Sequence, residues 1–474
     1  MNVDPSPARQ PPPRAAPVPA RQRAGDTTMG AHVAAPSGHT AAAAALLQRL
    51  FRNFDGGFAM RLWDGTKLRL GRAPESGVDP RFTLVCTHPG AIRSLLLGRD
   101  PLRLAEAYFR GDLDIEGDFF AALGLKDQLQ SLRLPLKDQL GLWLRAWRLP
   151  SSAAAETQTG PERGLRHART ARAHSKAGDR AAIQFHYDIS NAFYALWLDR
   201  AMVYSCAYFE HSDDSLDQAQ YAKLDHICRK LQLQPGDRFL DIGCGWGALV
   251  IHAARHFGVQ AHGITLSQRQ LELARERIRE AGLVDRVTVE LRDYRELPGD
   301  GAYDKIASVG MFEHVGLQNL PTYFASVHRL LTDTGLFLNH GITHDVEGWN
   351  RGLSSVFINR YVFPDGQLDT VSNIQRVMER ARFEIHDVEA LRRHYALTLR
   401  HWVARLEDAH TQALAHVSES TYRVWRLYMA ACALEFESGE IGVYQILASK
   451  RGTTPALPLT RRHLYPAIRA LSRD

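Results

Sequence analysis

Two hydrophobic periods alternate along the second part of the chain, from Ala181 onward. Short apolar runs are followed by segments whose apolar positions recur every three to four residues, the spacing of an amphipathic helix. Strands that alternate with helices in this way predict an α/β fold with a doubly wound, mainly parallel sheet. The predicted strands are RFLDI, VQAHGITLS, RVTVEL, YDKIASVG and GLFLNHGI.

Two of the predicted helices begin at capping-box spacing. Ser215 and Gln218 stand at the start of one, and Ser267 and Gln270 at the start of the next. The apolar residues of the first helix predict that it is amphipathic. They are Leu216, Tyr221, Leu224, Ile227 and Leu231.

The region 41–150 carries a different pattern, which predicts a smaller N-terminal α+β domain. Arg61–Leu70 has an Asp-Gly pair between alternating apolar and polar residues, a hairpin signal, and Phe82–Cys86 is typical of a further strand. Pro135–Leu149 predicts a helix that either packs on its own domain or lies in a lipid interface. Its apolar face consists of Leu136, Leu140, Trp143, Leu144 and Trp147.

Two further segments lack any such periodicity. Residues 1–40 are rich in Pro, Ala and Arg, which predicts a disordered tail. Residues 151–180 are basic, polar and aperiodic, which predicts a linker before a catalytic domain over 181–474.

Composition narrows the classes of function. A length of 474 residues permits two or three domains. The net charge of +6 is too weak to indicate nucleic-acid binding but is compatible with an anionic membrane surface. Five scattered cysteines have neither zinc-site nor CxxC spacing and suit a reducing compartment. We identify no signal peptide or membrane-spanning run, so we expect a cytoplasmic protein.

The stretch LDIGCGWG, Leu240–Gly247, contains the end of the first predicted strand of this sheet and the glycine loop that follows it. Ligands bind at the carboxyl ends of such strands, and glycines there let backbone N–H groups approach them closely. The spacing is GxGxG after Asp241 rather than the GxGxxG of dinucleotide binders. The tip of the next strand, Gly263–Ser267, offers no acid for a ribose, which disfavours NAD.

An acid followed by GxGxG at this position resembles motif I of class I S-adenosylmethionine-dependent methyltransferases. Together with further motifs, it closely resembles the cyclopropane-fatty-acyl-phospholipid synthase family, including its mycolic acid relatives, over about 181–450. Residues 41–150 are similar, more loosely, to the extra N-terminal domain of the bacterial phospholipid enzymes. The further motifs are HYDISNAFYALWLD, MVYSCAYFE, VGMFEHVG, LNHGI, FPDGQL, HYALTL and YMAACALEF.

The resemblance implies transfer of a methylene from S-adenosyl-L-methionine to a cis double bond in an unsaturated membrane phospholipid. That chemistry requires a methyl group held in line with the alkene, a dry site whose aromatic faces stabilise a carbocation, and a base that removes a proton. The resemblance also implies a peripheral membrane enzyme, an N-terminal lipid-associated domain and a homodimer.

The base that the resemblance implies is a bound bicarbonate. Its cage is expected to comprise Cys206, Glu313, His340, Ile342 and Tyr395. Glu313 and His340 follow two successive predicted strands near their carboxyl ends, which places both at the rim where the cofactor is expected. Cys432 matches a residue once regarded as the nucleophile of the family. It completes the candidate catalytic set, although we expect it to line the acyl tunnel or to pack in a buried helix.

The resemblance carries the cofactor site over to the glycine loop and three other segments. Tyr294 is expected to stack on adenine, and Gln270 to donate a hydrogen bond where other methyltransferases use an acid. The full set is Tyr204, Ser205, Asp241, Gly243, Cys244, Gly245, Trp246, Gly247, Thr265, Gln270, Asp293 and Tyr294.

Two further features come from the same resemblance. A helical stripe is expected to cover the cofactor and touch the acyl chain; it consists of Phe185, Ile189, Phe193, Leu196 and Trp197. Gly341 departs from the family, whose members usually carry Thr there, and we expect this to remove a side chain beside the anion.

Three alternatives remain open. The same carbocation, after hydride shift and reduction, gives a methyl-branched acyl chain instead of a ring. Some relatives methylate the nitrogen of a small amine. From a different class, a catalytically inactive lipid-binding protein is disfavoured by the intact cofactor loop and anion cage.

Overall fold

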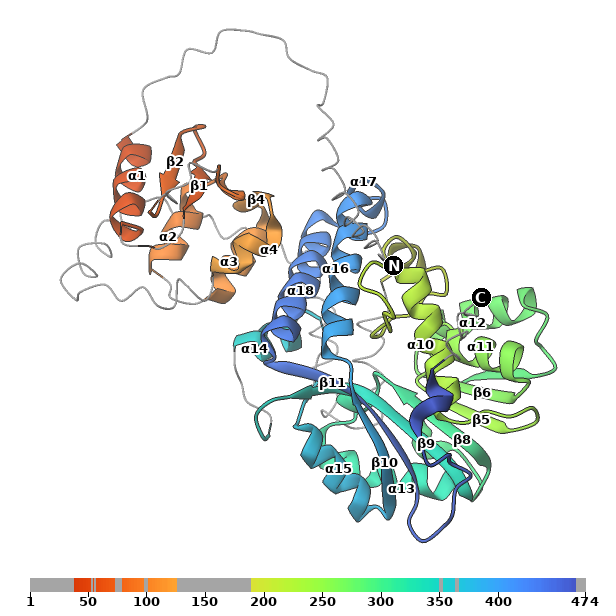
Figure 1. Cartoon of the computed structure of the whole chain (residues 1–474). Helices are drawn as coiled ribbons and strands as arrows, with labels where there is room; N and C mark the ends of the chain where they lie inside the picture. Colours follow the sequence, from red (N-terminus) through yellow and green to blue (C-terminus); the bar gives the residue numbers. More distant parts are fainter. Residues whose placement is uncertain are drawn as a thin grey trace, which may run out of the picture.

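The computed structural model describes residues 38–125, 189–348, 353–362 and 366–465, apart from 53, 55–56, 73–78 and 98–100. The predicted linker, the predicted helix at 135–149, Phe185 and nearly all of the predicted tail lie outside these residues. The described chain forms a smaller α+β unit within 38–125 and a larger α/β unit from 189 onward (Figure 1).

The smaller unit packs four helices around a four-stranded sheet of order β2-β1-β3-β4. The predicted hairpin is confirmed: Asp64 Oδ1 accepts a hydrogen bond from the N–H of Thr66 at 3.0 Å, and Gly65 adopts a φ of 88° in the turn. The elements are α1 (Gly38–Leu50), β1 (Phe58–Arg61), β2 (Lys67–Leu70), β3 (Phe82–Cys86), α2 (Pro89–Leu97), α3 (Pro101–Arg110), β4 (Leu113–Gly117) and α4 (Phe119–Leu123).

The larger unit is built on a seven-stranded sheet of order β10-β11-β9-β8-β5-β6-β7. Every pairing is parallel except the two made by β11, so the predicted doubly wound, mainly parallel α/β fold is confirmed. The strands are β5 (Arg238–Ile242), β6 (Gln260–Thr265), β7 (Val287–Leu291), β8 (Tyr303–Val309), β9 (Leu331–His344), β10 (Phe383–Ala390) and β11 (Ile441–Lys450).

Helices cover both faces of this sheet (Figure 1). One apolar cluster joins α10 (Leu216–Lys230), α11 (Ala248–Phe257) and α12 (Gln268–Glu280) to one face. A second cluster joins α13 (Leu320–Leu330) and α15 (Val371–Arg380) to the opposite face. Strands buried on both faces explain the nearly continuous apolar runs in the sequence.

The helix α10 confirms one prediction and corrects another. Ser215 and Gln218 form the predicted capping box. Tyr221, however, is 54% exposed, so its place on the buried face was wrong. A polar stripe is buried instead, at spacings of three and four residues that keep it on one side of the helix. It consists of Gln220, Lys223, His226 and Lys230.

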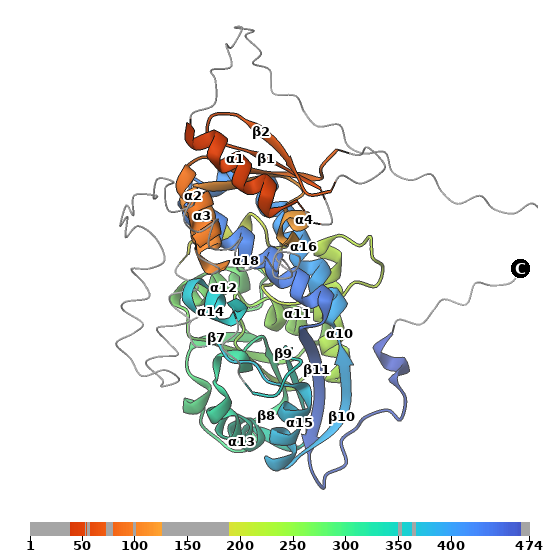
Figure 2. The same ribbon diagram turned by 90° about the vertical axis from the view of Figure 1, so that its left-hand side faces the viewer.

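A further layer of helices lies over the glycine loop and packs in one cluster with it. Its main elements are α16 (Arg392–Asp408) and α18 (Glu419–Ser438), which pack against each other, together with α9 (Asn191–Ala195) and α14 (Leu353–Tyr361). Figure 2 shows the smaller unit stacked over α16 and α18, on the side away from the seven-stranded sheet. The short α17 (His410–Ala413) lies between α16 and α18 in the chain.

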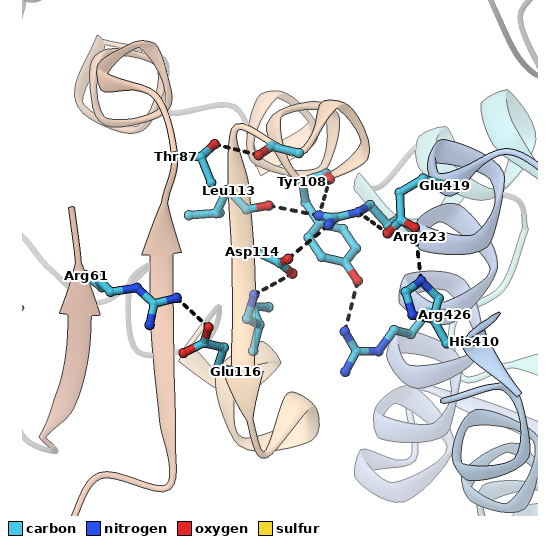
Figure 3. Close-up of polar contacts among 12 residues, drawn as sticks. Arg61, Thr87, Tyr108, Leu113, Asp114, Glu116, His410, Glu419, Arg423 and Arg426 are labelled. Atoms are coloured by element: carbon cyan, nitrogen blue, oxygen red, sulfur yellow. Dashed lines mark hydrogen bonds and ion pairs between the residues drawn. The ribbon is translucent and has the colours of Figure 1, made fainter. Parts of the chain in front are cut away.

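Arg423 of α18 anchors the smaller unit to the larger one (Figure 3). Its guanidinium group donates to the carbonyl oxygens of Tyr108, at 3.1 Å, and Leu113, at 3.3 Å, and to the carboxylate of Asp114, at 2.9 Å. One turn further on, Arg426 donates to the phenol oxygen of Tyr108 at 3.2 Å. The two units therefore share a partly buried polar contact in addition to an apolar one.

Within the described part of the chain, no helix combines the length and the apolar character that crossing a bilayer requires.

Candidate active site

The glycine loop begins where β5 ends, as predicted. Gly243, Gly245 and Gly247 have φ values of 84°, 55° and 81°, a region that residues with a side chain rarely adopt. The loop opens on a hollow at the carboxyl ends of β5, β6, β7 and β8. Eleven of the predicted cofactor residues line this hollow: Tyr204, Ser205, Asp241, Gly243, Cys244, Gly245, Trp246, Thr265, Gln270, Asp293 and Tyr294.

Gly247 is the predicted cofactor residue that does not line the hollow. It caps the N-terminus of α11, and a Cβ atom there would lie 3.3 Å from the side chain of Ala274. The tight turn and the close approach of α12 therefore explain why this position is a glycine, rather than contact with a ligand.

A buried cation beside the hollow was not predicted. Lys223 of α10 lines it, and its Nζ donates to the hydroxyl of Ser205 at 2.8 Å. Burial lowers the pKa of Lys223 to about 8, while Asp199, Cys206 and Asp241 oppose that shift.

Asp241 is the acid of the glycine-loop motif and is 2% exposed. Burial raises the pKa of its carboxyl to about 7, and the charge of Lys223 partly offsets this. Its Oδ1 is buried without a hydrogen-bond partner in the described residues. A buried acceptor of this kind fits a cationic ligand group such as an amino group.

One turn before Lys223, Gln220 holds the same segment through its backbone. The side-chain amide of Gln220 donates to the carbonyl oxygen of Ser205 at 2.9 Å and to that of Val203 at 3.4 Å. Together, Gln220 and Lys223 fix the segment 203–206, which carries both predicted cofactor residues and Cys206.

The far end of the hollow is built from the ends of β6 and β7. The Thr265 hydroxyl donates to Gln270 Oε1 at 2.7 Å, which orients that amide. The carboxylate of Asp293 accepts from the backbone N–H of Arg295 at 2.9 Å and from its Nε at 2.8 Å. Tyr294 is buried beside them, with its ring edge-on to Tyr323.

The predicted anion cage begins with Glu313, on the short 3-10 turn Phe312–His314 that follows β8. Its Oε1 accepts the backbone N–H of Ile342 at 2.7 Å, so Ile342 acts on Glu313 through its main chain. Burial raises the pKa of Glu313 to about 7, and this hydrogen bond partly offsets the shift. Glu313 Oε2 is buried and has no partner in the described residues.

His340 lies near the carboxyl end of β9, as predicted, although β9 continues beyond the predicted strand to His344. It is paired with Val309, the last residue of β8, so its position still coincides with the carboxyl end of the neighbouring strand. The imidazole is buried, which lowers its pKa well below the usual range. Its Nε2 has no hydrogen-bond partner in the residues described.

Backbone hydrogen bonds connect the other cage residues to this pair. The carbonyl oxygen of Leu391 accepts from the N–H of Tyr395 at 3.1 Å and lies 3.7 Å from Cys206 Sγ. The N–H of Leu391 in turn donates to Val443, which is directly opposite Ile342 in the β9–β11 ladder. These contacts join the segments that carry the five predicted cage residues, at the junction of β9, β11 and α16.

The thiol of Cys206 faces protein carbonyl groups. Besides Leu391, its Sγ lies 3.2 Å from the carbonyl oxygen of Ala207. Burial raises the pKa of this thiol well above its usual value, which keeps it protonated.

Cys432 is placed in the middle of α18, as a buried member of the helical cluster. Burial raises the pKa of its thiol well above the usual value, so the reactive thiolate is disfavoured. It does not line the cofactor hollow.

A continuous wall of aromatic side chains runs from the cofactor hollow to Tyr395 of the predicted cage. The ring of Trp246 lies 5.1 Å from that of Tyr194, which is 5.8 Å from Tyr204. Trp402 continues the wall, with its ring centroid 5.3 Å from that of Tyr204 and 6.0 Å from that of Tyr395. Of the predicted helical stripe, Phe193 and Trp197 are fully buried in the same cluster, and Ile189 and Leu196 pack against it.

A comparison with protein families identifies the chain. Residues 174–446 match the model of the family described as mycolic acid cyclopropane synthetase. The chain belongs to this family. It is an S-adenosylmethionine-dependent methyltransferase, as the earlier resemblance predicted.

Individual relatives agree with this assignment. A "probable fatty acid methyltransferase" of Pseudomonas putida is 43% identical over 413 residues, covering 86% of this chain and 95% of that protein. The cyclopropane-fatty-acyl-phospholipid synthase of Escherichia coli K12 is 41% identical over 276 residues, or 58% of this chain and 69% of the other.

Solved structures give the same result for the fold. A cyclopropane synthase from Mycobacterium tuberculosis is 34% identical with a TM-score of 0.54, covering 57% of this chain and 98% of that one. A mycolic acid cyclopropane synthase complexed with SAH and CTAB is 36% identical with a TM-score of 0.54 and the same coverage.

In this member of the family, the structure gives a different reason for the glycine at position 341 from the expected one. A Cβ atom at Gly341 would lie 2.0 Å from the ring of Phe312, on the opposite face of β9 from His340. The phenyl ring thus fills the space that a larger residue would need, and the side of β9 that faces the cage is unchanged.

Three residues that contact the candidate site were not predicted from the sequence: Lys223, Trp402 and Gln445. Lys223 gave a usable signal, since it shares the core-facing side of α10 with Leu224 and Ile227. A charged residue at such a position is rarely buried without a partner. The other two depend on contacts between distant segments and gave no local signal.

Proposed function

We propose that the protein is a cyclopropane-fatty-acyl-phospholipid synthase, which adds a methylene to the cis double bond of an unsaturated phospholipid acyl chain. When bound, S-adenosyl-L-methionine supplies the activated methyl group, and bicarbonate accepts the proton that leaves as the ring closes. The residues of this chain hold both groups, exclude water and stabilise the positive charge on the acyl chain.

The observation that carries this proposal is a pair of buried atoms, Glu313 Oε2 and His340 Nε2, each without a partner among the described residues. Buried polar atoms normally have a hydrogen-bond partner, so this pair fits a small ligand that can satisfy both. A raised pKa leaves much of Glu313 protonated near neutral pH, and a protonated carboxyl donates a hydrogen bond. Two donors beside an apolar cluster suit an oxyanion such as bicarbonate.

The aromatic wall supports the carbocation step. Trp246 at the cofactor loop and Tyr395 at the cage are connected through buried rings. Faces of Trp and Tyr attract positive charge, and this attraction is strongest where water is excluded. A dry, aromatic site also keeps water from adding to the cation.

The cofactor has a matching set of groups in the hollow where the wall begins. Glycine N–H groups, the buried acceptor Asp241 and the hydroxyl of Ser205 line one hollow. They suit the amino-acid portion of S-adenosyl-L-methionine, while Tyr294 suits its adenine ring.

The experiment pairs calorimetric titration of S-adenosyl-L-methionine with lipid analysis. The purified protein is incubated with vesicles of unsaturated phospholipid and cofactor carrying a labelled methyl group. We expect His340→Ala and Glu313→Ala to abolish ring formation while cofactor binding persists. Equal loss of binding and of product would contradict the roles assigned to these residues.

A second candidate product is a methyl-branched acyl chain. It is favoured by the 43% identity to the Pseudomonas putida protein, which is named a probable fatty acid methyltransferase. Mass spectrometry of the same lipids separates the two, because a ring adds CH2 and a reduced methyl branch adds two hydrogens more. Methylation of a small amine leaves the lipid mass unchanged.

We also propose that the enzyme acts in the cytoplasm as a peripheral membrane protein and a homodimer. The mildly basic net charge supports contact with an anionic membrane surface. Co-sedimentation with phosphatidylglycerol vesicles at low and high salt tests the first part, and light scattering tests the second.

A further inference from the structure

His340 has one side-chain contact that the proposed cage does not explain. Gln445 of β11 stands directly opposite His340 in the antiparallel β9–β11 ladder. Its amide nitrogen lies 3.2 Å from His340 Nδ1. Both side chains are buried, with exposed fractions of 0% for Gln445 and 2% for His340.

This contact decides where the imidazole carries its proton. A neutral histidine has one N–H and one acceptor nitrogen, and the hydrogen bond at one nitrogen determines the other. When the amide N–H of Gln445 donates to Nδ1, that nitrogen is the acceptor and the proton is on Nε2. Nε2 is the buried atom that has no partner in the described residues.

The electrostatic surroundings keep the ring neutral. Burial contributes most to the lowered pKa of His340, followed by the positive charges of Lys223 and Lys230. Glu389 opposes them, but it is already paired with Lys230 at 2.5 Å and with His226 at 2.8 Å. A neutral ring has a single N–H, so its position determines whether the cage gains a donor.

We propose that Gln445 is a positioning residue that holds His340 as the Nε2–H tautomer, so that the imidazole donates a hydrogen bond to the anion in the cage. The inference rests on the proposed function for the anion, but the tautomer itself is independent of any activity. His340 alone does not fix its tautomer, because without the Gln445 amide at Nδ1 the neutral ring can carry its proton on either nitrogen.

The amide is suited to this task in a way that other residues of similar size are not. A carboxylate at position 445 would accept a hydrogen bond from Nδ1–H, and would leave an Nε2 lone pair facing the anion. An apolar residue would impose no preference. Gln445→Glu and Gln445→Leu therefore change the tautomer in different ways while keeping the side-chain volume close to that of glutamine.

The direct test is nitrogen NMR of protein labelled at histidine with ¹⁵N, with the His340 signals assigned by comparison with His340→Gln. We expect wild type to show Nε2–H and Nδ1 as acceptor. Gln445→Leu should give a mixture of tautomers, and Gln445→Glu should give Nδ1–H or a protonated ring. An Nδ1–H tautomer in wild type would overturn the proposal whether or not the Gln445 variants fold.

Activity provides the second measurement. We expect Gln445→Leu to raise the bicarbonate concentration needed for half-maximal rate by about 10- to 100-fold, with unchanged affinity for S-adenosyl-L-methionine. The control is Ser449→Ala, because Ser449 of β11 also contacts a histidine, His386, at 2.8 Å, but away from the cage. It should leave the bicarbonate dependence unchanged, and an equal change in both variants would contradict the inference.

The two hypotheses fail in different ways. If His340 has the predicted tautomer but His340→Ala still forms rings, the proposed role of the anion cage is wrong and the role of Gln445 in the tautomer stands. If ring formation needs His340 but the tautomer is insensitive to position 445, the inference about Gln445 is wrong and the proposed function stands.

Discussion

The ammonium nitrogen of Lys223 lies 2.8 Å from the hydroxyl oxygen of Ser205, inside the cofactor hollow and next to the buried acid Asp241. Lys223→Met removes this donor and the positive charge that offsets Asp241. We expect the affinity for S-adenosyl-L-methionine to fall about tenfold in calorimetric titration.

Lys230→Met is the matched control, because it makes the same change two turns further along α10. Lys230 is equally buried but pairs with Glu389 and Asp387, outside the hollow. We expect it to lower stability and to leave cofactor affinity close to that of wild type. An equal fall in affinity for both variants would show that Lys223 acts only through folding.

Glu313 makes stability depend on pH. Burial raises its pKa from 4.5 to about 7, so the folded state binds this proton more tightly than the unfolded chain does. The associated stability is fully present below pH 4.5 and is lost as the pH rises through about 7. Over this pH interval, we expect the free energy of unfolding of wild type to fall by about 3 kcal/mol relative to that of Glu313→Gln. Urea denaturation of both proteins across the range measures the difference, and parallel curves would contradict it.

Gly341 leaves no room for a side chain. Gly341→Thr places a Cβ atom 2.0 Å from the ring of Phe312, which the buried turn cannot avoid without moving. We expect a loss of about 1–3 kcal/mol in the free energy of unfolding. The double variant Gly341→Thr with Phe312→Leu should recover part of this loss, because the smaller side chain vacates the space. A Gly341→Thr protein as stable as wild type would refute the steric explanation.

Arg423 holds the smaller unit against α18. Arg423→Ala removes its hydrogen bonds to Tyr108, Leu113 and Asp114 at this partly buried contact. We expect faster amide hydrogen exchange in β4 and α3, with little change in β5 or β8.

The control for this contact is Arg61→Ala. Arg61 pairs with Glu116 within the smaller unit, and both side chains are substantially exposed (Figure 3). Surface ion pairs contribute little, so exchange in α3 should remain as in wild type. Equal exchange in the two variants would mean that Arg423 has no special role in docking.

Cys432 is expected to be dispensable for chemistry. Its thiol is buried in α18 and its pKa is raised well above the usual value, so it is not available as a nucleophile. We expect Cys432→Ala to form cyclopropane rings at a rate within an order of magnitude of wild type. A complete loss of activity in a folded Cys432→Ala protein, shown by unchanged circular dichroism, would reverse this assignment.

Much of the fold was determined by local sequence. The apolar runs of the strands, the Asp-Gly turn and the capping residue Ser215 act over a few residues, so their structures follow from short-range geometry. The glycine loop is equally local, because residues with a side chain rarely adopt the φ values of Gly243 and Gly245. The cofactor hollow could be predicted from this local pattern and from the resemblance to the family.

The tertiary structure decided what these elements contact. Tyr221 has the right helical spacing for the core but is exposed, while Lys223 on the same helix is buried against Ser205. Gln445 and His340 are 105 residues apart and meet only through the register of β9 and β11. Burial and long-range pairing set the pKa values, the tautomer and the space at Gly341, and none of these is encoded within a short stretch of chain.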